Sequence, residues 1–260
     1  MELTPDSWYQ QLSIAFADGT VEVLHIERRS TGTHIPRRIE HPEPWTRLTF
    51  CKCPCCPLTD NVPACPAALS LQTTMNKLRP RSSIEMVKAT AIDAKGRSQT
   101  VEWPLQNVGS TLVQLAVFAS DCPVGYRLKP YLAGLPPFVN SLELSQHIAA
   151  GILKKHGGSV EAARQELAAT LTPLPDVFEH LTRRFRAGDA AGKEDPAPGP
   201  RDAVPNSLIS VDAFSKMLAR RADKLYAELS TELGWAETGR APAAQPERGG
   251  WVDRFLGLFR

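Results

Sequence analysis

The sequence has no apolar run long enough to cross a bilayer, since a transmembrane helix needs about 18 or more consecutive apolar residues. It also has little net charge: 30 Lys and Arg against 28 Asp and Glu leave +2, which argues against a nucleic-acid partner. The first residues, MELTPDSWYQQLSIAF, include acidic side chains and no basic segment followed by an apolar one. No secretory signal is therefore predicted, and we expect a cytoplasmic protein.

Motifs that carry well-known chemistry are missing as well. The sequence has no Gly-rich phosphate loop, no G-x-S-x-G elbow and no H-E-x-x-H motif. Residues 154–171 and the following 177–185 are similar to a helix-turn-helix of the Fis type. However, Pro173 and Pro175 intrude before the expected recognition helix, and Ala168 stands in the turn where glycine is expected. Nearby acidic residues alternate with arginines, as on a solvated helix face: Glu161, Glu166, Asp176 and Glu179. No catalytic site is indicated, and DNA binding is not favoured.

What the sequence does have is an apolar fraction of 42%, typical of a globular domain. Alternating apolar residues flank Asp18-Gly19, and Gly accepts the positive φ of a tight turn, so we predict a β-hairpin over residues 8–26. A second hairpin is predicted over 84–103, with its turn at Lys95-Gly96. Between the hairpins, residues 42–66 are rich in proline and cysteine, and only a short strand at 46–50 is expected there.

From about residue 105 the apolar spacing becomes helical. We predict a helix that ends at Cys122-Pro123, with Ser159 as the N-cap of a later one, and further helices at 141–156, 159–171, 176–186 and 207–233. Residues 187–205 have the composition of a flexible loop, and residues 236–249 that of a linker. The prediction is a single α+β domain over 1–235, with a mostly helical second part.

Four of the six cysteines are followed directly by proline: Cys53, Cys56, Cys65 and Cys122. Cys53 and Cys56 have the C-x2-C spacing that lets one tight turn direct two thiolates at the same ion. Four thiolates suit a tetrahedral zinc site or an iron–sulfur cluster, and we predict these four as the metal ligands. Cys51 or Cys55 could replace one of them. The alternative is a set of buried or redox-sensitive thiols without metal. His25, His34 and His41 are near in sequence but are not assigned as ligands.

These cysteine-proline segments resemble those of an uncharacterised bacterial protein family. The resemblance rests on CPCCPL (53–58), CPAALSL (65–71), CPVGYRLKP (122–130) and PNSLISVDAFSKML (205–218), and extends over residues 8–235. It implies one architecture, namely a hairpin, a cysteine-rich loop, another hairpin and a helical remainder. It implies no function.

The last residues, 250–260, have apolar side chains at helical spacing. An exposed aromatic patch of this kind is typical of a docking segment, and we predict an amphipathic helix that binds a protein partner through Trp251, Phe255, Leu256, Leu258 and Phe259. Packing against the domain itself is the alternative. Peripheral membrane contact is weakly indicated, because the segment is short and has few basic residues.

Two hypotheses for the function follow. The first is a metal-binding, non-enzymatic adaptor that docks through its C-terminal helix. The second is an iron–sulfur protein that transfers electrons or senses oxidants.

Overall fold

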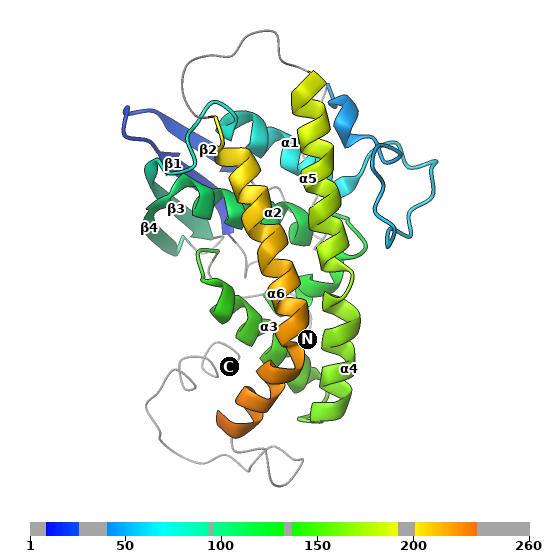
Figure 1. The fold of residues 1–260 in the computed structure, drawn as a ribbon. Coiled ribbons are helices and arrows are strands. Elements are labelled where there is room, and N and C mark those ends of the chain that lie inside the picture. Colours follow the sequence, from blue (N-terminus) through cyan, green and yellow to red (C-terminus); the bar gives the residue numbers. More distant parts are fainter. Residues whose placement is uncertain (1–8, 26–40, 94–95, 133–136, 192–200, 233–260) are drawn as a thin grey trace.

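A computed structural model describes residues 9–25, 41–93, 96–132, 137–191 and 201–232. The strands are β1 (Tyr9–Ala15), β2 (Val21–His25), β3 (Met86–Asp93) and β4 (Ser98–Pro104). The α-helices are α1 (Pro66–Leu78), α2 (Leu105–Ala119), α3 (Ser141–Lys155), α4 (Val160–Leu171), α5 (Leu174–Ala191) and α6 (Ala203–Glu232). Two short 3-10 helices are η2 (Pro44–Thr46) and η3 (Gly125–Leu132). The predicted α+β class is confirmed (Figure 1).

The four strands form one antiparallel sheet in the order β2-β1-β3-β4. Both predicted hairpins are present, and their turn glycines Gly19 and Gly96 have φ of +83° and +74°. Alternate side chains of β1 and β3 are buried, among them Leu12, Ile14 and Ala89. The sheet therefore has one covered face, and α2 packs against β3 and β4.

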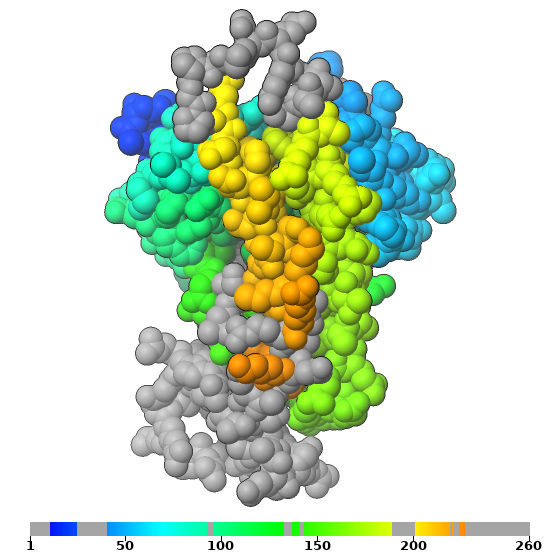
Figure 2. Space-filling model, in the orientation of Figure 1, coloured from blue at the N-terminus to red at the C-terminus, as the bar shows by residue number. Residues whose placement is uncertain are grey.

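Helix α2 is the centre of the fold. It contacts α1, α6 and η3, and α6 in turn packs against α3, α4 and α5. In Figure 2 the long helices α5 and α6 lie side by side across the front of the molecule, with the sheet on one flank and residues 41–65 on the other. The approach of α2 to α6 is close, since a Cβ on Gly109 would meet the Ser207 hydroxyl at 2.0 Å.

Helix α1 was not predicted. Its sequence nevertheless contains the expected signals: Pro66 occupies the first turn, where its missing N–H costs nothing, and Leu71, Met75 and Leu78 are buried at helical spacing. The dense proline and cysteine content just before it obscured these signals.

The predicted strand at 46–50 is wrong. Pro44 begins a 3-10 turn, and beyond it only Arg47 forms a single isolated bridge, with Ala64. The predicted loop 187–205 is too long, because α5 continues to Ala191 and α6 begins at Ala203; residues 192–200 lie outside the described residues. Ser159 is the N-cap of α4 as predicted, although its side chain makes no capping hydrogen bond.

The linker at 236–249 and the docking helix at 250–260 also lie outside the described residues. Among the helices that the structure describes, none is both long and apolar enough to span a membrane.

Candidate metal centre

The four Cys-Pro cysteines come from three separate segments of the fold. Cys53 and Cys56 lie in the loop between η2 and α1, Cys65 is the N-cap of α1, and Cys122 follows the end of α2. Their thiols are near enough for charges on them to interact: Cys53 with Cys65 and Cys122, and Cys56 with Cys65 and Cys122. Segments that are distant in sequence thus bring the four side chains near one another.

Backbone hydrogen bonds fix each of these segments. The Cys56 amide donates to the Cys53 carbonyl at 3.0 Å, which closes the C-x2-C turn. The Cys65 amide donates to the Thr46 carbonyl at 2.8 Å and so ties the start of α1 to η2. The Cys122 amide donates to the Ser120 hydroxyl at 3.3 Å, and the Cys122 carbonyl accepts from Tyr126 at 2.8 Å. The thiols are therefore positioned by their own main chain.

Burial differs between the two pairs. Cys65 and Cys122 are each 7% exposed, whereas Cys53 and Cys56 are half-buried on the loop. Burial raises the pKa of Cys53, and charges on Cys65, Cys55 and Cys122 would raise it further. Burial likewise raises the pKa of Cys122 to about 11. Without a cation Cys53 and Cys122 stay protonated at neutral pH, because gathering thiolate charges in a dry site is unfavourable.

Main-chain amides act to lower the pKa values of the two buried thiols, Cys65 and Cys122, and so oppose the effect of burial. Burial raises the pKa of Cys65, and the amides of Ala68 and Ala67 oppose it. At Cys122 the amides of Gly125 and Val124 do the same. No main-chain amide near Cys65 makes a regular capping hydrogen bond with its side chain, so the amides favour the thiolate form electrostatically. Metal-bound thiolates in proteins commonly have main-chain amides near the sulfur.

The thiols converge without forming a finished coordination sphere. In the described ranges, no three His, Cys, Asp or Glu side chains are arranged so that they could hold a metal ion as they stand. A tetrahedral zinc site needs each sulfur at about 2.3 Å from the ion. Metal binding would thus require the sulfurs to move closer together, and the loop that carries Cys53 and Cys56 has no regular secondary structure to resist this movement.

The remaining two cysteines, Cys55 and Cys51, contact the α4–α5 connection and α5. Cys55 donates its S–H to the Pro173 carbonyl at 3.6 Å, at the α4–α5 connection. Burial raises the pKa of Cys55, and the nearby Asp176 adds to the rise. Cys51 is exposed, and its carbonyl lies 3.1 Å from the Nδ1 atom of His180. Charge on Cys55 also acts on Cys53, so Cys55 lies near the four Cys-Pro thiols, and the choice of these four as ligands stays a prediction.

The other predicted site residues are not placed by the structure. Trp251, Phe255, Leu256, Leu258 and Phe259 lie outside the described residues, as does His34. His41 is exposed and offers its carbonyl to Gln72.

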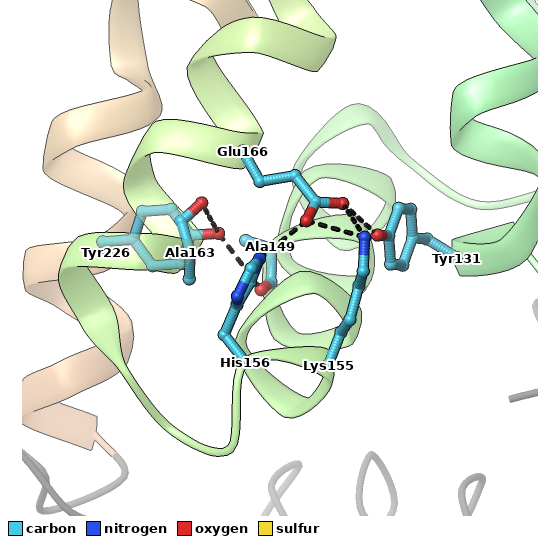
Figure 3. Close-up of polar contacts among 7 residues, drawn as sticks. All are labelled: Tyr131, Ala149, Lys155, His156, Ala163, Glu166 and Tyr226. Atoms are coloured by element: carbon cyan, nitrogen blue, oxygen red, sulfur yellow. Dashed lines mark hydrogen bonds and ion pairs between the residues drawn. The ribbon is translucent and has the colours of Figure 1, made fainter.

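A second polar cluster surrounds Glu166 on α4 (Figure 3), although the sequence around Glu166 indicates a solvated helix face. Tyr131 donates to the carboxylate, Lys155 donates to both of its oxygens at 2.8 Å, and the His156 Nε2 atom lies 2.6 Å from it. Burial alone would raise the pKa of Glu166, but hydrogen bonds from these three residues outweigh it and lower the pKa.

The same contacts act on the partners of Glu166. The hydrogen bond to Glu166 raises the pKa of Lys155, and burial together with Glu166 raises the pKa of Tyr131 to about 12. Beside this cluster, Tyr226 of α6 donates to the Ala163 carbonyl at 3.1 Å. Each charge in the cluster is therefore matched, and the cluster joins η3, α3 and α4.

Residues 11–233 match the family described as a domain of unknown function, DUF6901. The match covers most of the chain, so the chain belongs to this family, and its limits are close to those of the sequence resemblance. No curated protein and no solved structure matches the chain.

Proposed function

For this member of a family without an assigned function, we propose that Cys53, Cys56, Cys65 and Cys122 bind one metal centre, either zinc or an iron–sulfur cluster. The observation that carries the proposal is the gathering of four Cys-Pro thiols from three segments, with charges that would repel one another. A cation removes this repulsion, and the amides beside Cys65 and Cys122 favour the thiolate form once the metal has displaced the protons.

The role proposed for the metal is structural. Cys53 and Cys56 lie in a loop that has no regular secondary structure, whereas Cys65 and Cys122 are fixed at helix ends. A shared metal ion would cross-link this loop to α1 and α2. We further propose a non-enzymatic adaptor, in which the tail residues Trp251, Phe255 and Phe259 dock on a partner protein; this second part rests on the sequence of the tail.

Anaerobic purification of the full chain tests the metal proposal. Elemental analysis should find about one zinc per chain in a colourless protein, or iron and sulfide in a brown one, as the chemistry of four thiolates requires. The double variant Cys53→Ser/Cys56→Ser should lose the metal, and the control Cys51→Ser should keep it. A wild-type protein that holds neither metal and takes up no Zn²⁺ would disprove the proposal.

The colour of the protein also separates the two hypotheses for the function. A brown protein with a reversible reduction of its cluster would favour electron transfer or oxidant sensing over a purely structural centre. Zinc has no redox chemistry in proteins and would favour the adaptor.

A further inference from the structure

The two edges of the sheet differ in what lies beside them. Strands β2 and β4 are the outer strands of the order β2-β1-β3-β4 (Figure 1). An outer strand has main-chain amides and carbonyls that its own sheet leaves unpaired, so it pairs readily with another strand unless it is covered or carries charge. The contacts along each edge therefore indicate whether that edge is closed.

The β2 edge is closed by a lysine. The Phe16 amide donates to the Thr20 carbonyl at 2.9 Å, which makes this the first hydrogen-bonded pair of the β1–β2 ladder. Hydrogen-bonded pairs alternate with non-hydrogen-bonded pairs, so the main-chain groups of Val23, in the middle of β2, point away from β1. Lys77 of α1 donates to the Val23 carbonyl at 3.1 Å and also binds the Glu22 carboxylate. A lysine in this place hinders the addition of a further strand.

The β4 edge has main-chain groups of the same kind. Just beyond β4, the Leu105 amide donates to the carbonyl of the residue before β3 at 2.8 Å. The register continues from there without a shift, so Val101 bonds to β3, and the amides and carbonyls of Thr100 and Glu102 point away from it. The hydroxyls of Thr100 and Thr90 lie 2.9 Å apart, the close approach that is typical of a non-hydrogen-bonded pair.

Among the residues that the structure describes, nothing covers the β4 edge. There, β3 is the one strand paired with β4, and no described side chain binds the main chain of Thr100 or Glu102 as a lysine does at the β2 edge. On the covered face of the sheet, the apolar side chains of Val101 and Trp103 are only half-buried. A further strand beside β4 would bond the outward main-chain groups and bury both side chains.

We propose that β4 is the interface of a homodimer, in which it pairs antiparallel with β4 of a second copy, centred on Val101, and joins the two sheets into one. A second copy fits because β4 is self-complementary in this register. Val101 lies opposite the partner's Val101, a β-branched pair that packs well across strands. Glu102, the one charged residue of β4, lies opposite the partner's Thr100, so no like charges are opposed. The outward amides and carbonyls of these two residues then bond to one another.

Sedimentation equilibrium of the full chain over a range of concentrations measures the dimer. Thr100→Pro removes an outward amide and leaves the bonds to β3 in place, and an edge strand accepts proline at such a position. Thr100→Glu places a carboxylate opposite the partner's Glu102. Thr100→Lys is the matched control, because it places an ammonium group there instead. Since Thr100 is exposed, all three variants should fold, which circular dichroism checks.

Each substitution acts twice in a symmetric dimer. We expect the wild type to dimerise, and Thr100→Pro and Thr100→Glu each to raise the Kd of the dimer by about tenfold. Thr100→Lys should leave the Kd unchanged or lower it. A wild-type chain that is monomeric at every concentration would overturn the inference. A dimer that Thr100→Pro and Thr100→Glu leave unchanged would place the interface elsewhere, and equal weakening by Thr100→Glu and Thr100→Lys would rule out the register centred on Val101.

Hydrogen exchange of the wild type, followed by NMR, gives a readout that needs no variant. The amides of Thr100 and Glu102 should exchange more slowly as the protein concentration rises, whereas the amide of Val101, which bonds to β3, should be protected throughout. Fast exchange at Thr100 and Glu102 in a concentrated dimer would contradict the inference. Because none of these measurements depends on a bound metal, this inference and the proposed function can fail separately.

Discussion

The two clusters of ionisable side chains in this fold differ in how their charges are balanced. Around Glu166, one carboxylate meets a tyrosine, a lysine and a histidine, and its pKa is lowered. Around Cys53, the Cys-Pro thiols lie near enough for charges on them to repel one another, and the pKa values of Cys53, Cys65 and Cys122 are raised. The first cluster is complete with the side chains it has. In the second, the thiols Cys53, Cys65 and Cys122 act to raise one another's pKa, and this difference is why we propose a metal for it alone.

The difference also assigns a structural role to the Glu166 cluster. Its members come from η3, α3 and α4, so its hydrogen bonds hold together the helical part that follows Cys122. A His–Glu pair in a protein often invites a catalytic interpretation. Here the carboxylate is already occupied by Lys155 and Tyr131 as well, which leaves the pair no free acceptor for a substrate.

The largest effect is expected from removing thiols. Cys53→Ser/Cys56→Ser should abolish metal binding and lower the melting temperature by about 10 °C, because a ligand at a thousand times its Kd adds about 4 kcal/mol to the free energy of unfolding. Elemental analysis and thermal unfolding measure both.

Glu166→Gln is the matched variant from the other cluster, and it should keep its full metal content. Equal metal loss in both variants would erase the distinction between the clusters.

A smaller effect is expected from adding a methyl group at Gly188, where α5 packs against Trp45 of η2. A Cβ on Gly188 would lie 2.5 Å from the Trp45 Cδ1 atom and 2.8 Å from its Cγ. Trp45 is buried and its Nε1 donates to Glu43 at 2.6 Å, so the ring cannot easily move. Gly188→Ala should therefore cost about 1–2 kcal/mol of stability after the gain of roughly 1 kcal/mol in helix propensity. Urea unfolding measures it.

Gly151→Ala provides the comparison on the Glu166 side. Its Cβ would approach the Tyr131 Cδ1 atom at 2.9 Å, a milder conflict than the 2.5 Å approach at Gly188. We expect Gly188→Ala to weaken Zn²⁺ binding and Gly151→Ala to leave it unchanged. If Gly151→Ala weakens Zn²⁺ binding and Gly188→Ala does not, then Zn²⁺ binding depends on the Glu166 side of the fold, and this prediction is wrong.

Both clusters show what the sequence could and could not predict. The hairpins were predictable because Gly19 and Gly96 supply the positive φ of their turns, and α2 because its apolar period is regular. The shared Cys-Pro setting grouped four cysteines from three segments, and their role as metal ligands stays a prediction. Helix α1 was missed because the cysteine-rich segment before it hides its start.

The environment of single charges could not be predicted. Arg183 and Arg184 are adjacent and chemically identical, yet one is exposed and the other buried, since successive residues of a helix point about 100° apart. Glu166 resembles the exposed Glu161 in sequence, and only the packing of α3 and η3 against α4 distinguishes them. Contacts between residues that are distant in sequence decide whether such a side chain is buried or exposed, and a local sequence pattern does not predict these contacts.

The Glu166 cluster itself should contribute stability that depends on pH. Because the pKa of Glu166 is lowered on folding, its contribution is fully present above the unfolded value of about 4.3 and is lost as the pH falls through the lowered value. We expect Glu166→Gln to cost about 1 kcal/mol near pH 7. That difference from wild type should shrink as the pH falls below the unfolded value of about 4.3 and through the lowered pKa, where the wild-type carboxylate gains its proton.

Urea unfolding at several pH values measures this difference, and Glu161→Gln on the exposed face of α4 is the control. A difference between wild type and Glu166→Gln that stays constant at every acidic pH at which both proteins fold would show that shape, and not charge, is what Glu166 contributes.

The smallest effect on stability is expected from a segment that belongs to neither cluster. Residues 236–249 are rich in alanine, proline and glycine and have little apolar surface to bury, and residues 250–260 are too few for a helix that is stable alone in water, which takes about 12–15 residues. If Trp251, Phe255 and Phe259 serve a partner, deleting 236–260 should change the melting temperature by less than about 2 °C, in line with under 1 kcal/mol for a domain of this size. Metal content should also be unchanged. A fall of 5 °C or more would show that these aromatic side chains belong to the core of the domain, and the adaptor part of the proposal would then have no segment left with which to dock.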